Sequence, residues 1–138
     1  MLNQRLIKFC NDNFRDGKLI LEKLNEYKKI LISENEKMNL IGISTLEDFD
    51  ERHFLDCIQI NQYLPNRNKT VMDVGTGAGL PGIILSIIGF HNLHLVEKSP
   101  KKSAFLKNCK LRLNLNYHVH DKPVADLSSP SIDYITAR

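Results

Sequence analysis

The chain has 138 residues, 42% of them apolar and 25% charged, and its formal net charge is +3 at pH 7. This size suits a single globular domain with its own core, and the mild positive charge permits contact with RNA without arguing for it. Neither a run of about 20 apolar residues nor the apolar core of a signal peptide is present. We therefore expect a cytoplasmic protein that has no membrane partner.

Three cysteines, Cys10, Cys57 and Cys109, are widely separated and form no Cys-x-x-Cys pair. Such spacing indicates buried or incidental thiols in a reducing compartment, and it argues against a disulfide framework or a zinc site.

Before Pro65, the spacing of apolar residues predicts three helices, over residues 2–13, 18–37 and 46–63. The second helix carries an apolar stripe that contains one lysine and consists of Leu21, Leu24, Lys28, Leu31 and Ile32. We therefore expect an amino-terminal helical extension, residues 1–64, followed by a cofactor-binding part, residues 65–138.

After Pro65, short apolar runs alternate with helical segments. Strands are expected at residues 71–74 and 93–96, a third around His118 and His120, and a fourth at the end of the chain. A helix begins at Ile83, and another follows Glu97. Strand, helix, strand, helix, strand, loop, strand is the order of an α/β protein with a parallel, doubly wound sheet.

A glycine-rich turn joins the first predicted strand to its helix. Residues 77–82 (GAGLPG) satisfy G-x-G-x-x-G, the pattern that seats a pyrophosphate on a helix N-terminus. Glu97 ends the next strand, where an acid can accept hydrogen bonds from both hydroxyls of a ribose. Because NAD and S-adenosylmethionine both carry an adenosine, these two features suit either cofactor.

Asp73 favours S-adenosylmethionine over NAD. A carboxylate at the start of the turn would repel a pyrophosphate, whereas it could help to hold the cationic part of S-adenosylmethionine, directly or through water. The register of residues 73–79 (DVGTGAG) is of the methyltransferase type. The crossover rule for parallel strands places Gly75 and Glu97 at the same edge of the sheet, as a cofactor site requires.

Several further segments of the chain resemble the motifs of one methyltransferase family. The chain resembles the GidB/RsmG family of bacterial small-subunit rRNA methyltransferases from about Leu19 onward, in residues 39–44 (NLIGIS), 51–56 (ERHFLD), 73–83 (DVGTGAGLPGI), 95–102 (LVEKSPKK) and 135–138 (ITAR). Two segments depart from the family pattern. Glu34 stands where the family commonly has a tryptophan, and the third-strand motif is here residues 122–126 (KPVAD).

The resemblance implies a Rossmann-like, class I methyltransferase that uses S-adenosylmethionine to methylate N7 of a guanine in the decoding-region loop of 16S rRNA, in the small ribosomal subunit. N7 is an unprotonated lone pair, so we expect no dedicated catalytic base. The family pattern implies methionine contacts at Asp73 and the glycine turn, a ribose contact at Glu97, adenine contacts at Val124 and Ala125, and a place for Arg138 at the mouth of the site. The full set of expected cofactor-binding residues is Asp73, Gly75, Gly77, Leu80, Glu97, Val124, Ala125 and Arg138.

Other histidines are weaker candidates. His118 and His120 share one face of a predicted strand, but without a third ligand we expect no metal site. His53 could contact RNA or cofactor, or simply pack between helices. Family chains continue beyond the position of Arg138, so we expect this chain to be an amino-terminal piece whose sheet lacks its last strands. An NAD- or nucleotide-binding domain and a non-catalytic RNA-binding remnant stay open as alternatives.

Overall fold

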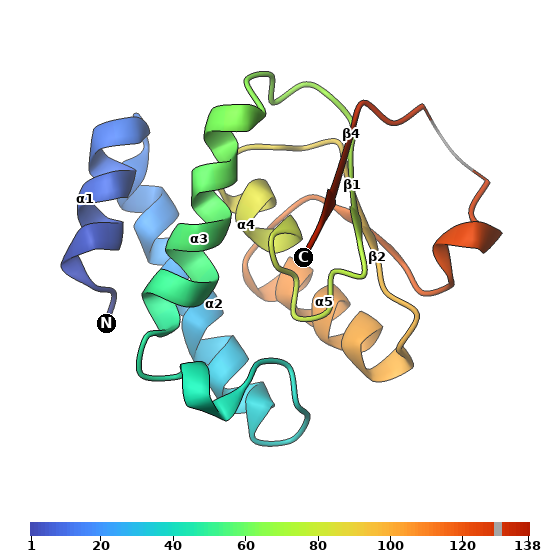
Figure 1. The fold of residues 1–138 in the computed structure, drawn as a ribbon, viewed down its shortest axis with the longest axis horizontal. Coiled ribbons are helices and arrows are strands. Elements are labelled where there is room, and N and C mark those ends of the chain that lie inside the picture. Colours follow the sequence, from blue (N-terminus) through green and yellow to red (C-terminus); the bar gives the residue numbers. More distant parts are fainter. Residues whose placement is uncertain (129–130) are drawn as a thin grey trace.

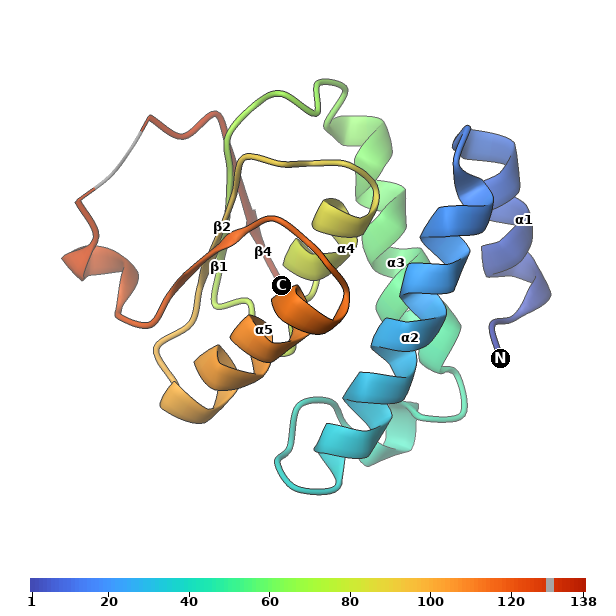
Figure 2. The same cartoon turned by 180° about the vertical axis from the view of Figure 1, so that it is seen from behind.

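The computed structural model describes residues 1–128 and 131–138 and arranges them in layers (Figure 1). Helices α1 (Gln4–Asn13) and α2 (Gly17–Asn35) lie on one side with a helical segment that follows them in the chain. Helices α4 (Gly82–Ile87) and α5 (Pro100–Arg112) form the middle layer and cover one face of the sheet. Figure 2 shows the same layers from behind.

The sheet has four parallel strands in the order β3-β2-β1-β4. They are β1 (Val71–Val74), β2 (Leu93–Val96), β3 (His118–His120) and β4 (Tyr134–Ala137). This order confirms the predicted α/β fold, because each crossover from β1 to β3 passes through a helix on the same face. Val74 pairs with Val96, so Gly75 and Glu97 follow at one edge of the sheet.

Helices α1 and α2 confirm the first two predicted helices, with a different buried stripe in the second. Asn3 caps α1, its side chain accepting a hydrogen bond from the Leu6 N–H at 2.9 Å. The stripe of α2 that faces the core is formed by Ile20, Leu24, Tyr27, Ile30 and Leu31. Lys28 lies at its margin, where its ammonium group pairs with Asp50 at 2.7 Å, and Ile32 is exposed.

The predicted third helix begins later than expected and is irregular. A short turn, η1 (Ile43–Thr45), precedes a continuous helical segment made of η2 (Asp50–Leu55), α3 (Asp56–Ile58) and η3 (Gln59–Tyr63). The first part, η2, is a π-helix, in which the N–H of Asp56 bonds to the carbonyl of Glu51. Such wide turns are rare and frequently accompany functional sites.

One apolar core joins the helical layers to the sheet. All six residues of α4 are buried, because this helix packs against β2 and also against α2 and α3. The buried cluster runs from Leu2 to Tyr117 without a break between residues 1–64 and 65–138. Across residues 1–128 and 131–138, no helix has both the length and the apolar character needed to cross a membrane.

The second face of the sheet carries a row of histidines. His94 of β2 pairs in register with His118 of β3, and its Nδ1 lies 2.9 Å from Nε2 of His120. The sequence pattern missed His94 as a neighbour of these two residues. Within the described part of the chain, however, no group of three or more His, Cys, Asp or Glu side chains is arranged to hold a metal ion.

The environment of these rings makes stability dependent on pH. Burial and then the neighbouring His120 and His118 lower the pKa of His94. The pKa of His120 is lowered by burial and then by His118 and Lys122, while Asp121 opposes the shift. The unfolded chain therefore binds more protons than the folded chain when the pH falls through the ordinary histidine range.

We expect the free energy of unfolding to fall as the pH is lowered from about 7.5 to about 5.5, because folding must hold these rings neutral. His94→Gln should flatten this dependence, since it removes the ring between the other two. Urea unfolding at both pH values measures the effect. An equal pH dependence in parent and variant would contradict it.

Candidate cofactor site

The glycine turn between β1 and α4 has a backbone that other residues adopt poorly. Gly75, Gly77 and Gly79 have φ angles of +67°, +57° and +92°. A Cβ added at Gly75 or Gly77 would meet no atom within 4 Å, whereas one at Gly79 would overlap the side chain of Ile83. The first two glycines thus leave open space beside the turn, and Gly79 allows it to pack on the helix.

Asp73 lies beneath this turn and is fully buried. Its Oδ2 accepts hydrogen bonds from the Thr76 hydroxyl at 2.6 Å and the Gly82 N–H at 2.8 Å. Its Oδ1 accepts from the Thr136 hydroxyl at 3.0 Å. Burial raises the pKa of Asp73, and these hydrogen bonds oppose the rise. One carboxylate therefore holds the turn, the start of α4 and strand β4 together.

Glu97 holds the turn from the side of β2. Its Oε1 accepts from the Gly77 N–H at 3.1 Å and its Oε2 accepts from the Ser99 N–H at 2.8 Å. The N–H groups of Gly75 and Thr76 donate to the carbonyl of Val96 at 3.0 and 3.2 Å. The ends of β1 and β2 and the turn thus form one hydrogen-bonded unit.

Two cavities adjoin the turn, and Gly75 lines both. The larger, about 280 Å³, is lined by Val74, Gly75, Val96, Glu97, Lys98, Lys122, Pro123 and Val124. The smaller, about 190 Å³, is lined by Leu40, Ile41, His53, Gly75, Thr76, Gly77, Ala78, Leu80 and Arg138. A further cavity, about 540 Å³, lies between α1 and α2 and shares no lining residue with these two.

The cavities bring together six of the eight residues expected to bind cofactor. Glu97 and Val124 line the larger cavity, Gly77, Leu80 and Arg138 line the smaller, and Gly75 joins them. Asp73 and Ala125 are not among the described residues that line either cavity. Ala125 is exposed in the short helix η4 (Val124–Asp126), and Asp73 is buried beneath the turn.

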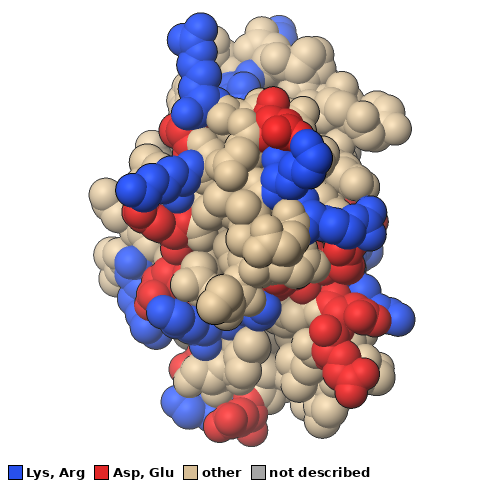
Figure 3. All heavy atoms as spheres, turned by 90° about the vertical axis from the view of Figure 1, so that its left-hand side faces the viewer, with Lys and Arg blue, Asp and Glu red and all other residues tan. Residues whose placement is uncertain are grey.

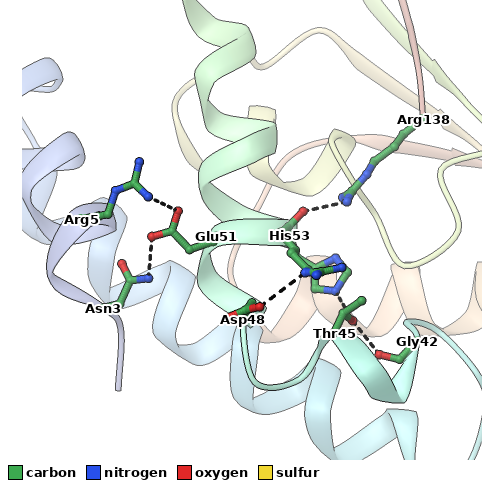
Figure 4. A network of polar contacts seen from close by, with 9 residues as sticks. Asn3, Arg5, Gly42, Thr45, Asp48, Glu51, His53 and Arg138 are labelled. Carbon is green, nitrogen blue, oxygen red and sulfur yellow. Dashed lines mark hydrogen bonds and ion pairs between the residues drawn. The ribbon is translucent and has the colours of Figure 1, made fainter.

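Arg138 connects the end of β4 to the irregular helical segment (Figure 4). Its Nη2 donates to the carbonyl of Arg52 at 2.7 Å, and its Nη1 lies 3.3 Å from the sulfur of Cys57. The Asp56 carboxylate is 4.0 Å away. The guanidinium thus closes one side of the smaller cavity.

His53 lines the same cavity. The Thr45 hydroxyl donates to the Gly42 carbonyl at 2.6 Å, so it accepts from Nε2 of His53 at 2.7 Å, which assigns the ring proton to Nε2 (Figure 4). Burial, Arg138 and Arg52 lower the pKa of His53. Its Nδ1 is buried and has no hydrogen-bond partner within the described residues.

The sequence pattern missed the residues that support the turn. Thr76 and Thr136 donate to Asp73, and the Tyr27 hydroxyl donates to the Ala78 carbonyl. Thr76 lies only three residues after its partner, a spacing that could have indicated the contact. Thr136 and Tyr27 are distant in sequence, and only the fold brings them to the turn.

The fold and the glycine turn define an α/β protein with a Rossmann-like arrangement of parallel strands and helices. The protein family described as "GidB: rRNA small subunit methyltransferase G" matches residues 20–138. The chain therefore belongs to the GidB family, as its sequence motifs suggested.

Curated relatives agree with this assignment. Proteins named "Ribosomal RNA small subunit methyltransferase G" from Orientia tsutsugamushi (strain Boryong) and Rhodospirillum rubrum are 39% and 37% identical over 103 and 118 residues. These alignments cover 75% and 86% of this chain, and 52% and 59% of the relatives. A Rickettsia rickettsii (strain Sheila Smith) protein of the same name is 38% identical over 100 residues. The chain spans about half the length of the curated relatives it matches.

Asp73→Asn should lower the free energy of unfolding by about 1.5–3 kcal/mol, because an amide nitrogen cannot accept the hydrogen bonds that a buried carboxylate accepts. Asp133→Asn is the matched control, since the Asp133 carboxylate accepts from the Thr70 N–H at 2.9 Å in an exposed position. Urea unfolding near pH 7 compares the two. An equal loss in the free energy of unfolding in both variants would show that the hydrogen bonds of Asp73 do not hold the turn together.

Proposed function

We propose that this chain is the cofactor-binding part of an enzyme that transfers a methyl group from S-adenosylmethionine to N7 of a guanine in 16S rRNA. The observation that carries the proposal is the pair of cavities that meet at Gly75, one of them lined by Glu97. A methyl donor and a methyl acceptor need adjoining sites of this kind. The relatives' names supply the substrate class, ribosomal RNA of the small subunit.

The larger cavity fits an adenosine. Each oxygen of Glu97 accepts one backbone hydrogen bond and keeps a lone pair that can accept from a ribose hydroxyl. Val96 and Val124 supply apolar walls on which an adenine can pack. When bound, S-adenosylmethionine supplies a methyl group on a positively charged sulfur.

The smaller cavity fits the methionine end of the cofactor and the target base. Leu40, Ile41 and Leu80 give this cavity apolar walls, and Arg138 can contact a phosphate of the RNA. N7 of guanine carries a free lone pair, so no proton has to be removed from the base before the methyl group is transferred. Holding the two reactants in line can supply about 7–11 kcal/mol of the barrier, which makes positioning the main task of these residues.

The start of α4 supports S-adenosylmethionine over NAD. A dinucleotide places its pyrophosphate on the free N–H groups of the helix that follows the glycine turn. Here the Asp73 carboxylate already accepts from the Gly82 N–H. A pyrophosphate at this point would meet a negative charge and lose a donor.

The helical end of the molecule does not stand out as a surface for RNA. Figure 3 shows Lys and Arg interspersed with Asp and Glu over this face. Arg5 pairs with Glu51 at 3.0 Å and Lys8 with Asp12. Paired charges of both signs give little net attraction for phosphates. We therefore place the RNA at the mouth of the smaller cavity, beside Arg138, and the enzyme in the cytoplasm, where ribosomal subunits are.

Calorimetric titration of the chain with S-adenosylhomocysteine and, separately, with NAD tests the proposal. We expect heat of binding from S-adenosylhomocysteine alone. Binding of NAD alone would identify a dinucleotide-binding domain. If neither S-adenosylhomocysteine nor NAD bound, the result would favour a non-catalytic RNA-binding remnant that keeps the turn only as a scaffold.

Gly75→Val should abolish binding of S-adenosylhomocysteine, because the new side chain enters the space between the two cavities. Strain at a positive φ should lower the free energy of unfolding by about 1–2 kcal/mol, and circular dichroism should show a folded protein. Gly89→Val is the control, since Gly89 also has a positive φ, +113°, but lies after α4 and lines neither cavity. Parent-like affinity in a folded Gly75→Val protein would place the ligand elsewhere.

A further inference from the structure

We infer that Tyr27 of α2 is a positioning residue for the cofactor turn, so that the amino-terminal helices form part of the cofactor site. This inference rests on the proposed function, because it takes the turn to be where the cofactor binds. None of the sequence motifs of the turn includes Tyr27, which is 46 to 55 residues upstream of Asp73 and Gly82 along the chain.

Tyr27 makes a direct polar contact with the turn. Its side chain is fully buried, and its hydroxyl donates to the carbonyl of Ala78. Ala78 itself lines the smaller cavity, between Gly77 and Gly79. A Cβ placed on Gly79 would lie 3.1 Å from the same hydroxyl, so Tyr27 also fills the space beside this glycine.

The ring of Tyr27 is held in place by aromatic packing. It stacks on Phe54 with a centroid distance of 5.5 Å and an interplanar angle of 13°. Phe54 in turn meets the edge of Phe49 at 5.0 Å. Burial raises the pKa of Tyr27, which keeps the hydroxyl protonated and able to donate. The donor is therefore fixed in both position and protonation state.

The turn needs an anchor on this side because its own backbone is permissive. Three glycines within five residues allow many conformations, and ordering them costs entropy. Glu97 and Asp73 restrain the turn from the sheet, through the N–H of Gly77 and the hydroxyl of Thr76. Tyr27 restrains it from the helical layer. Because the turn is held from both sides, less conformational entropy is lost when a ligand binds to it.

A purely structural role is the competing explanation, and the chain contains a control for it. Tyr117 is also fully buried, and its hydroxyl donates to the carbonyl of Leu106 at 2.6 Å, in α5. Both tyrosines thus bond a backbone carbonyl in the core, but only Tyr27 reaches a residue that lines a cavity beside the turn. Replacing either by Phe removes one hydroxyl and keeps the ring.

The test compares Tyr27→Phe with Tyr117→Phe in the full chain, by calorimetric titration with S-adenosylhomocysteine and by urea unfolding. Tyr27→Phe should weaken binding about two- to tenfold, the range that a single neutral hydrogen bond supplies. Tyr117→Phe should lose similar stability and keep the affinity of the parent. The inference would be overturned if Tyr27→Phe bound S-adenosylhomocysteine with the affinity of the parent, or if both variants lost affinity equally.

Hydrogen exchange separates failure of this inference from failure of the proposed function. The Gly79 N–H donates to the Thr76 carbonyl at 2.9 Å within the turn. If Tyr27 positions the turn, this amide should exchange faster in Tyr27→Phe than in Tyr117→Phe, whether or not the parent binds S-adenosylhomocysteine. A parent that binds no S-adenosylhomocysteine rejects the proposed function, and equal exchange in both variants rejects the role of Tyr27.

Discussion

The buried carboxylate of Asp73 is the interaction on which the rest of the site depends. A charge without solvent is costly, and here three hydrogen bonds offset that cost. Each bond reaches a different element: the turn, the start of α4 and strand β4. The acid that begins this motif therefore stabilises the fold of the turn, in addition to any attraction for a cationic cofactor. The same group makes the helix N-terminus a poor place for a pyrophosphate.

The helical layer contacts both the turn and the end of strand β4. Tyr27 reaches Ala78 from α2, and Arg138 reaches the Arg52 carbonyl from the end of β4. The smaller cavity lies beside these contacts, and its walls come from Leu40, Ile41 and His53, from the turn and from Arg138. The irregular helix η2 places His53 and the Arg52 carbonyl there. The amino-terminal helices thus shape the site in addition to covering α4.

The predicted elements agree with the structure where the local pattern is strong, and they differ where distant contacts decide. The apolar runs at β1 and β2 and the order of strands and helices along the chain follow from the sequence, because these two central strands are mostly buried and read as short apolar segments. The stripe on α2 differs from the prediction because Lys28 finds a partner in Asp50, 22 residues away. The helix predicted over residues 46–63 begins at Asp50, and its π-helical first turn has no signature in residue spacing.

The sequence by itself determined the family, the alternation of strands and helices along the chain, the glycine turn and the position of Glu97 at the end of β2. These follow from local residue patterns and from the geometry of parallel crossovers. Only the tertiary structure decided that Asp73 points beneath the turn, that Thr136 and Tyr27 support it, and that two cavities meet at Gly75. The physical reason is that a buried polar group must find its partners wherever the fold brings them. Partners that are 63 and 51 residues apart in the chain leave no periodic signal for the sequence to show.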